Sequence, residues 1–185
     1  FNNKKVIITG HTGFKGSWLS YWLSIFGANV VGVSNNLITV PSHYTAIKLS
    51  KKIKNNFFDI SDKNKVLNLF RKEKPDYIFH LAAQALVNKS YQDPMLTWQS
   101  NTMGTLSILD GLKKMKLRKK CVCVLITSDK SYKNIETSKG YKENDELGGK
   151  DPYSASKAAA DIAIKSYFNS FFLKKKTKLR IGVAR

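Results

Sequence analysis

A short apolar run, Lys5–Thr9, leads directly into three glycines spaced G-x-x-G-x-x-G and then into an amphipathic run, Gly16–Phe26. Glycines allow such a turn to bend tightly and leave room for a ligand close to the backbone. The helix that follows offers free N–H groups and a positive dipole end to a pyrophosphate. The arrangement therefore predicts the start of a dinucleotide-binding unit. The loop residues expected to hold the cofactor are Gly10, Thr12, Gly13, Phe14, Lys15 and Gly16.

Short apolar runs and longer amphipathic runs alternate through the rest of the chain. The further strands are expected at Asn29–Ser34, Phe57-Phe58, Asp76–Leu81, Cys121–Thr127 and Leu179–Ala184. The further helices are expected at Asp62–Lys74, Leu96–Met115 and Pro152–Phe172. This alternation predicts parallel strands joined by crossover helices. We expect an α/β fold with a doubly wound parallel sheet, the Rossmann fold, in strand order 3-2-1-4-5-6, with ligands at the carboxyl ends of the strands.

The length of 185 residues suits one domain with a core on both faces of a sheet. The chain starts at Phe1 and stops at Arg185, directly after the last strand-like run. We therefore expect residues 1–185 to be a cofactor-binding domain that carries the catalytic residues, cut off before a C-terminal substrate domain. No apolar run approaches the ~20 residues of a membrane span, and no signal peptide opens the chain. A cytoplasmic protein without a membrane partner is expected.

The charge is strongly positive, with 32 Lys and Arg against 13 Asp and Glu and a net charge of +19. Such an excess raises nucleic acid or another polyanion as a partner. Basic clusters lie at Lys51–Lys54, Lys113–Lys120 and Lys174–Lys178, and the last two follow helix-like runs, where cations suit a helix C-terminus. No aromatic residue is interleaved for stacking on bases, so nucleic-acid binding is disfavoured.

Cys121 and Cys123 alternate within one apolar run. We expect their side chains on opposite faces of a strand, as buried free thiols that form neither a mutual disulfide nor a metal site. Such thiols suit a reducing cytoplasm.

The adenosine half of a dinucleotide should meet the ends of the second and third strands. The usual acid at the end of the second strand is replaced here by Val33-Ser34-Asn35-Asn36. Asn36 can still bond a ribose hydroxyl, and no Arg stands beside it to hold a 2′-phosphate, so NAD is favoured over NADP. Asp59-Ile60 is placed to bond the adenine amino group, although Asp59 would serve equally as a turn or N-cap residue.

Tyr153 and Lys157 lie four residues apart in the first turns of a long expected helix and so share one face. A lysine ammonium beside a phenol favours its ionised form, so such a tyrosine can act as an acid or base nearer neutral pH. The same lysine can hydrogen-bond a ribose. An ordinary exposed helix pair is the alternative, and the glycine loop, a Ser-Asp at a strand end and an upstream Asn outweigh it.

Tyr-x-x-x-Lys together with the glycine loop resembles the short-chain dehydrogenase/reductase superfamily, and His80–Gln84 resembles a cofactor-lining segment of its extended, sugar-nucleotide branch. Ser128 would by this resemblance hold a substrate hydroxyl. Asn101 would support a proton relay or the site backbone, or be a structural residue of its helix. His11, His43 and His80 receive no catalytic role. The resemblance adds Leu81, Ala82, Ala83, Gln84, Asn101 and Thr127, with Tyr153 and Lys157, to the cofactor-binding set.

The segment Thr127-Ser128-Asp129-Lys130 bears on the reaction. A 4,6-dehydratase must remove a proton beside a ketone and expel a hydroxide, which requires a second base and an acid. This segment and the runs Gly10–Trp18 and Gly148–Ser154 resemble the CDP-glucose 4,6-dehydratases, which carry Ser-Asp-Lys where dTDP-glucose enzymes carry Thr-Asp-Glu. The resemblance implies a lyase of deoxysugar and polysaccharide biosynthesis that converts CDP-glucose to CDP-4-keto-6-deoxyglucose.

In that reaction Tyr153 would take the proton of the 4-hydroxyl, a neutral Lys130 would remove the C5 proton, and a protonated Asp129 would donate to the departing 6-hydroxyl. A solvated turn with a local ion pair is the alternative for the last two. The alternative functions are another sugar-nucleotide enzyme (a 4-epimerase or a dTDP-glucose-type dehydratase), a non-catalytic NAD-binding module and a polyanion binder. The resemblance also implies a homodimer or higher homo-oligomer joined through the two long helices.

Overall fold

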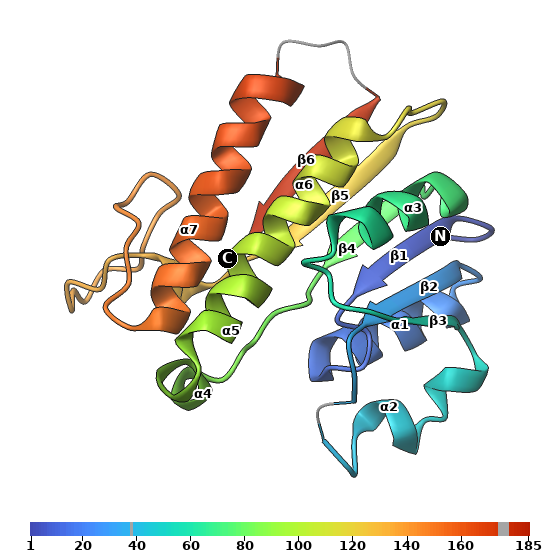
Figure 1. Cartoon of the computed structure of the whole chain (residues 1–185), viewed down its shortest axis with the longest axis horizontal. Coiled ribbons are helices and arrows are strands. Elements are labelled where there is room, and N and C mark those ends of the chain that lie inside the picture. The colour runs from blue at the N-terminus through green and yellow to red at the C-terminus, as the bar shows by residue number, and fades with distance from the viewer. Residues whose placement is uncertain (38, 174–177) are drawn as a thin grey trace.

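The computed structural model describes residues 1–37, 39–173 and 178–185, so most of the basic cluster at 174–178 lies outside the described residues. Six parallel strands form one sheet in the order β3-β2-β1-β4-β5-β6 (Figure 1), which confirms the predicted Rossmann topology. The strands are β1 Lys5–Thr9, β2 Asn29–Ser34, β3 Lys54–Phe57, β4 Tyr77–His80, β5 Cys121–Ile126 and β6 Leu179–Ala184.

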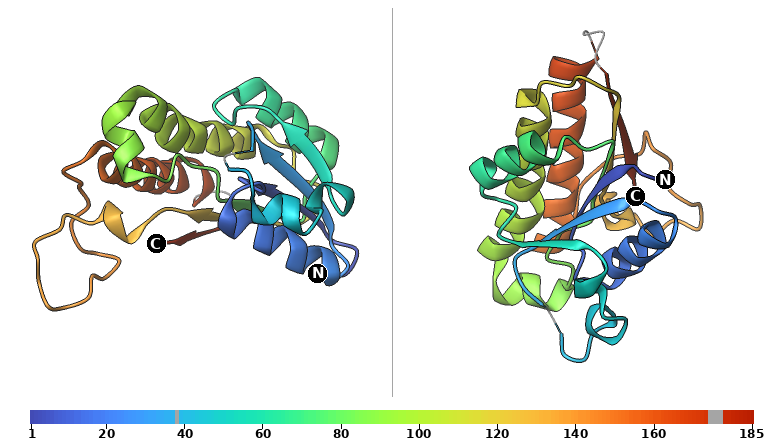
Figure 2. Two further views of the ribbon diagram at one scale, coloured as in Figure 1. Left: turned by 90° about the horizontal axis from the view of Figure 1, so that it is seen from below. Right: turned by 90° about the vertical axis from the view of Figure 1, so that its right-hand side faces the viewer.

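The helices lie in two layers, one on each face of the sheet. Figure 2 shows α3, α6 and α7 over one face and α1 and α2 over the other. None of the described helices is both long and apolar enough to cross a membrane. The helices are α1 Phe14–Ile25, α2 His43–Ala46, α3 Lys63–Glu73, α4 Val87–Gln92, α5 Pro94–Trp98, α6 Gly104–Lys114 and α7 Pro152–Tyr167.

Each face of the sheet buries its own apolar cluster. Phe70 of α3, Leu109 of α6 and Ile164 of α7 pack with buried strand residues in the larger cluster. Val6 and Ile8 of β1 pack on the opposite face with residues of α1 and of the segment after β2. Removing this apolar surface from water is the main term that holds the layers on the sheet.

Both cysteines are fully buried free thiols in the larger cluster. The expectation that they point to opposite faces is wrong, because residues two apart in a strand lie on the same face. Burial, above all, raises the pKa of both thiols, that of Cys121 to about 12.

The third strand differs most from its predicted position. It spans Lys54–Phe57 instead of Phe57-Phe58, and it pairs with β2 from Val31 to Ser34. Polar residues suit this strand because it lies at the edge of the sheet, where a charged side chain such as the exposed Lys54 discourages pairing with another chain. The side chain of Asn56 also donates to the Gly32 carbonyl oxygen at 3.2 Å. By contrast β1, β2 and β6 have the predicted bounds.

Helix α1 packs on the sheet through small residues and not through its aromatic ones. Its buried residues are Gly16, Ser17, Ser20 and Leu23. Trp22 is 57% exposed, so the aromatic part of its apolar stripe faces outward. Small residues lie on the inner face of α1 because the helix passes close to the glycine loop: a Cβ on Gly16 would lie 2.0 Å from the Gly10 carbonyl oxygen.

The predicted helix Leu96–Met115 is interrupted. A π-helical turn, Gln99–Met103, joins α5 to α6, and a second π-helical turn, Phe168–Phe172, follows α7. Such turns are rare, and they often occur at functional sites because they re-aim one side chain. The first of them carries Asn101, which is 1% exposed.

Candidate active site

Most of the predicted site residues come from four segments that meet at the carboxyl edge of the sheet. The glycine loop follows β1, the segment Leu81–Gln84 follows β4, and the turn Ser128–Lys130 follows β5. Helix α7, which carries Tyr153 and Lys157, packs against that turn. Ligands bind at this edge in doubly wound folds, so the structure brings the residues together where chemistry is expected.

The glycine loop turns tightly onto the neighbouring strand. Gly10 has φ +77°, and a Cβ there would lie 2.8 Å from the Ala82 nitrogen. Gly13 is the N-cap of α1 and supplies no side-chain cap. The first turn of α1 therefore presents backbone N–H groups at an uncapped, electropositive helix end.

The loop is also tied to the end of β2. The Thr12 hydroxyl donates to the Asn36 carbonyl oxygen at 2.8 Å, and its backbone N–H donates to the Ser34 hydroxyl at 3.3 Å. The structure thus brings Asn36 beside the glycine loop, and its contact with a ribose stays a prediction.

His11 lies in the loop but points into the protein. It is fully buried, and its ring bonds the Ser34 hydroxyl and the Asn55 side-chain oxygen, each at 3.1 Å. Burial lowers the pKa of His11, opposed in part by hydrogen bonds with the Val33 backbone and the Asn55 side chain. A Cβ on Gly32 would lie 2.4 Å from the ring. His11 therefore fastens the loop to β2 and β3, a role that its sequence position did not indicate.

Asp59 and Ile60 lie just beyond β3, and the two have separate surroundings. One carboxylate oxygen of Asp59 accepts from the Ser61 N–H at 2.8 Å, which is the turn role left open by the sequence. Ile60 is buried, and a Cβ on Gly104 would lie 2.6 Å from its side chain. The N-cap of α3 is Asp62 and not Asp59. The contact from Asp59 to adenine stays a prediction.

His80 joins the ends of β1, β4 and the interrupted helix. Its Nδ1 lies 2.8 Å from the Thr9 hydroxyl, and its Nε2 lies 3.1 Å from the Thr105 hydroxyl. The Thr105 hydroxyl donates to the Asn101 carbonyl oxygen, so it accepts from the Nε2–H. Complete burial, with a smaller effect of the Lys157 charge, lowers the pKa of His80 to about 3. His80 is thus a neutral structural residue.

Asn101 supports the backbone of the site. Its side-chain oxygen accepts from the Gln84 N–H at 2.8 Å, and its amide nitrogen donates to the Gln84 carbonyl oxygen at 3.1 Å. The same nitrogen donates to the Ser156 hydroxyl on α7 at 2.9 Å. Asn101 therefore links the segment after β4 to the helix of Tyr153, contacts that suit support of the site backbone, while a part in a proton relay stays a prediction.

Helix α7 begins at a well-made cap and carries a buried lysine. Asp151 accepts from the Ser154 N–H at 3.0 Å and from its hydroxyl at 2.6 Å. Lys157 is 6% exposed, and its ammonium lies 3.5 Å from the Ile126 carbonyl oxygen, the long limit of a hydrogen bond. Burial, and after it the charge of Lys15, lower the pKa of Lys157 to about 8.

The turn after β5 holds its polar groups in a more open setting. The Ser128 hydroxyl accepts from the Lys130 N–H at 3.2 Å and lies 3.1 Å from a carboxylate oxygen of Asp129. Asp129 and Lys130 are both exposed. Thr127, just before them, is buried and donates to Asp161 at 2.9 Å, so its side chain faces the protein interior.

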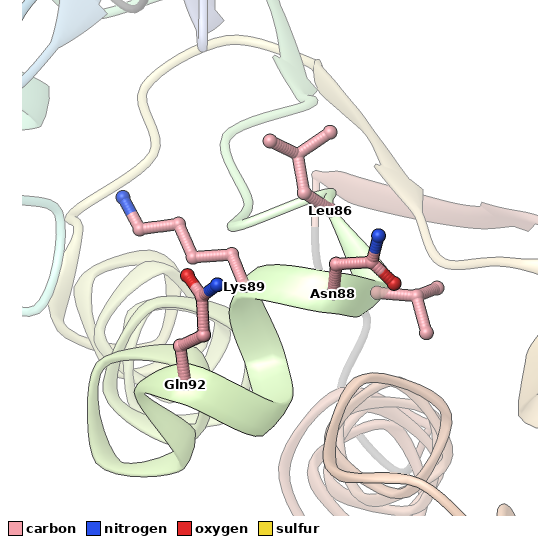
Figure 3. A pocket seen from close by; sticks show the side chains of 5 residues that line it. Leu86, Asn88, Lys89 and Gln92 are labelled. Atoms are coloured by element: carbon pink, nitrogen blue, oxygen red, sulfur yellow. The ribbon is translucent and has the colours of Figure 1, made fainter.

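A pocket of about 440 Å³ lies beside these elements, between the segment after β4 and α4. Figure 3 shows Leu86 on the loop and Asn88, Lys89 and Gln92 on α4 around it. Helix α4 packs against α7. The sequence does not reveal the start of α4, because its N-cap residue, Leu86, makes no side-chain hydrogen bond and gives no capping signal.

A second cavity, of about 460 Å³, lies at the opposite, amino edge of the sheet and is lined by several lysines. Lys5 and Lys54 there form ion pairs with the buried Glu73. Its position is away from the edge at which α/β sheets bind ligands. In the part of the chain that the structure describes, no group of three or more His, Cys, Asp or Glu side chains could hold a metal ion.

Comparison with known proteins finds relatives of this chain. The family described as GDP-mannose 4,6 dehydratase matches residues 7–178. A CDP-glucose 4,6-dehydratase of Salmonella typhimurium is 44% identical over 172 residues, which cover 93% of this chain and 47% of that protein. A dTDP-D-glucose 4,6-dehydratase of Dictyostelium discoideum is 30% identical over 92% of this chain and 42% of its own length. The chain thus spans about half the length of these curated relatives.

Among solved structures, the UDP-glucose 4-epimerase of Thermus thermophilus, in complex with NAD, aligns with a TM-score of 0.79. It is 26% identical, and the alignment covers 98% of this chain and 54% of that one. The fold of the epimerase half is therefore the fold seen here.

Proposed function

The chain belongs to the GDP-mannose 4,6 dehydratase family, and from this membership we propose that it is the NAD-binding, catalytic part of a CDP-glucose 4,6-dehydratase. The observation that carries the proposal is the turn after β5, where Ser128, Asp129 and Lys130 stand beside the helix of Tyr153. A second acid and a second base are what a dehydratase needs beyond the groups that move the 4-hydroxyl proton.

The residues present fit a dinucleotide. The uncapped start of α1 and the glycine turn form a cradle that side chains would fill, because Cβ atoms on Gly10 or Gly16 would collide with neighbouring backbone. Lys15 and Lys157 add two cations near this end. Asn36 would meet a ribose, and Asp59 the adenine. Within this proposal NAD, when bound, would supply the hydride acceptor for oxidation at C4 and the hydride donor for reduction at C6.

The chain's own groups would handle the protons. Tyr153, on the same helix face as Lys157, takes the proton of the glucose 4-hydroxyl while Ser128 holds that oxygen. The resulting ketone acidifies the C5–H bond. Lys130 takes the C5 proton, the electron pair forms the C5–C6 double bond, and the 6-hydroxyl leaves with the proton of Asp129 as water. A proton then returns to C5 as hydride reaches C6. The net reaction converts CDP-glucose to CDP-4-keto-6-deoxyglucose and one water.

Asp129 and Lys130 need a setting from which water is excluded. A neutral lysine and a protonated aspartate are favoured where water is excluded. Both side chains are exposed in this structure, so the substrate itself would have to cover them. The pocket lined by Leu86, Lys89 and Gln92 is the space that we propose for part of the sugar nucleotide.

The rest of the enzyme is part of the proposal. Because the chain spans about half the length of its relatives, we propose that a further substrate domain supplies the contacts to the nucleotide base. A homodimer through α5–α6 and α7 is supported by the exposed Met95, Met103 and Ile162 on these elements. Free buried thiols are compatible with a cytoplasmic location.

The alternatives lack a comparable observation. A 4-epimerase or a non-catalytic NAD module has no use for the acid and base that follow Ser128. A dTDP-glucose enzyme would share the chemistry and differ in the base recognised. Polyanion binding is disfavoured because Lys114 and Lys119 pair with Asp110 and Asp76, each at 2.7 Å, and Lys113 lies over the Phe171 ring.

The test uses the full-length protein with CDP-glucose and a catalytic amount of NAD, and it follows the sugar nucleotide by mass. Loss of one water without net reduction of the cofactor is expected. An unchanged mass would contradict the dehydratase, and a product that keeps its 6-hydroxyl would point to the epimerase. CDP-, dTDP- and GDP-sugars compared side by side identify the base.

A further inference from the structure

A buried carboxylate that no proposed proton transfer uses lies on the catalytic helix. Asp161 is on α7, four residues beyond Lys157, and its side chain is 4% exposed. Arg185 meets it with two parallel bonds, from Nε to Oδ2 and from Nη2 to Oδ1, each 2.9 Å long. This fork geometry is the strongest form of an arginine–carboxylate pair. The hydrogen bonds to Asp161, above all, raise the pKa of Arg185.

The pair reaches both ends of the turn that carries the proposed acid and base. On one side, the Thr127 hydroxyl donates to Asp161 Oδ2 at 2.9 Å. On the other side, Arg185 Nη1 donates to the Tyr132 hydroxyl at 2.7 Å, and the guanidinium lies 5.0 Å from the centre of the Tyr132 ring. Residues 128–131 are thus bracketed by one ion pair.

The same arginine holds the long segment between the turn and α7. Arg185 Nη1 donates to the Glu143 carbonyl oxygen at 3.1 Å. Tyr132 stacks on Tyr141 with ring centres 5.1 Å apart, and it bridges to Leu147 in antiparallel fashion. The segment projects beside the start of α7 (Figure 1).

We propose that the Asp161–Arg185 pair is a positioning device that sets Asp129 and Lys130 against Tyr153 and thereby governs the elimination step. The inference rests on the proposed function. Asp129 and Lys130 are exposed, so their reach toward C5 and C6 of a sugar depends on where the backbone of the turn lies. That backbone is fixed to α7 through Asp161 and Arg185, and neither residue touches the reacting atoms.

Loss of the pair should separate the two halves of the reaction. Tyr153 and Lys157 stay in α7, and the Thr127 N–H still bonds the Ala184 carbonyl oxygen, so the start of the turn keeps its place in the sheet. Oxidation at C4 should therefore change less than about threefold. Misplacing the acid and base by about 1 Å costs on the order of 100-fold, so water loss should slow by about that factor.

The experiment compares Arg185→Gln and Asp161→Asn with the parent in the full-length protein, in single turnovers with CDP-glucose. In both variants, reduced nicotinamide and a 4-keto sugar nucleotide that still carries its 6-hydroxyl should accumulate transiently. Neither should accumulate in the parent. Lys133→Gln is the matched control, because it breaks only the exposed Lys133–Glu146 pair in the same segment and should leave both steps unchanged.

A second readout needs no activity. Amide hydrogen exchange over residues 132–147 should quicken in Arg185→Gln while exchange over α7 and β5 stays as in the parent. If Arg185→Gln does not fold, Arg185→Lys takes its place in the test. This variant keeps the positive charge but loses the two parallel bonds to Asp161. It should also slow water loss more than oxidation at C4, by a smaller factor.

The outcomes are distinct. The positioning role would be overturned if oxidation and water loss slowed equally. It would also be overturned if the relative rates of the two steps and the hydrogen exchange over residues 132–147 were all unchanged. A parent protein that loses no water from any sugar nucleotide would refute the proposed function instead, and the exchange result would then stand by itself as a structural coupling.

Discussion

Helix α7 and the turn after β5 both carry proposed catalytic groups, but they hold them in different ways. On α7, Lys157 is buried and the helix is fastened by Asp151 at its start and by Asn101 from the side. On the turn, Asp129 and Lys130 are exposed and depend on contacts beyond both ends of the segment.

The difference separates two kinds of chemistry. Moving the proton of a substrate hydroxyl requires a phenol and a cation held in one fixed geometry, which a packed helix supplies. Elimination requires groups that exchange protons with the substrate. Side chains on an open turn can do this once the bound ligand covers them. Variation in the turn, on an unchanged helix, is therefore an economical route to a different reaction.

The largest effect is expected on the helix. Tyr153→Phe removes the hydroxyl that accepts the first proton, so no later step can occur, and turnover should fall by about 10³–10⁴. Product formation by mass in the full-length protein checks this. Tyr91→Phe is the control, since that side chain is 66% exposed. A Tyr153→Phe variant with normal turnover would remove the helix from the mechanism.

Lys130→Ala should have the next largest effect, and it should fall on one step. Water loss should slow by about 10²–10³ because the C5 proton loses its base. Oxidation at C4 should continue, so reduced nicotinamide should build up in a single turnover. Full-rate dehydration in this variant would show that Lys130 is not the base and that its turn is only a solvated loop. The control, Lys133→Ala, should behave as the parent.

Lys157→Met tests the burial that distinguishes the helix. A folded-state pKa of about 8, against 10.5 in the unfolded chain, means that the unfolded state binds more protons between these values. Stability of the parent should therefore rise with pH from about 8 to 10.5. The variant lacks this penalty and should be more stable at pH 7 by on the order of 3 kcal/mol while losing activity.

Urea unfolding at pH 7 and at pH 10.5 measures this difference. The advantage of Lys157→Met should shrink as the pH rises through that window. A variant less stable than the parent at pH 7 would mean that the lysine is not penalised by burial.

The smallest effect concerns the cap of the helix. Asp151→Ala should lower the free energy of unfolding by about 1 kcal/mol. Burial raises the pKa of Asp151, but hydrogen bonds from Ser154 and Tyr153 lower it by more, so its folded-state pKa is depressed. The contribution of Asp151 to stability is therefore present above the ordinary aspartate pKa of 3.8, and it is lost as the pH falls below that value.

Glu143→Ala, an exposed side chain in the adjoining segment, is the control in the same denaturation series. Equal stability of Asp151→Ala and the parent at pH 7 would contradict the capping role.

Local patterns predicted the regular parts of this molecule well. The strand Asn29–Ser34 is apolar and bounded by Gly27 and Asn35, so its limits could be seen in the sequence and were confirmed. Tyr153 and Lys157 could be paired because helix geometry relates positions four apart.

Interactions between distant segments could not be predicted in this way. No spacing rule relates Asp161 to Arg185 or His11 to Asn55, because the crossovers of the fold bring them together. A signal did exist at Asp161: it is a lone carboxylate in the run Ala158–Ala163, one turn beyond Lys157, and such a group requires a partner when buried. The outward aromatic stripe of α1 had the opposite cause, since close packing on the loop selects Gly16 and serines for the inner face.

The central claim is that one molecule of sugar nucleotide is oxidised, dehydrated and reduced at a single site. CDP-glucose carrying deuterium at C4 tests it most directly in the full-length protein with NAD. The account predicts a product lighter by one water with the deuterium in its C6 methyl group. Deuterium retained at C4 in a sugar that keeps its 6-hydroxyl would contradict the account and favour epimerisation.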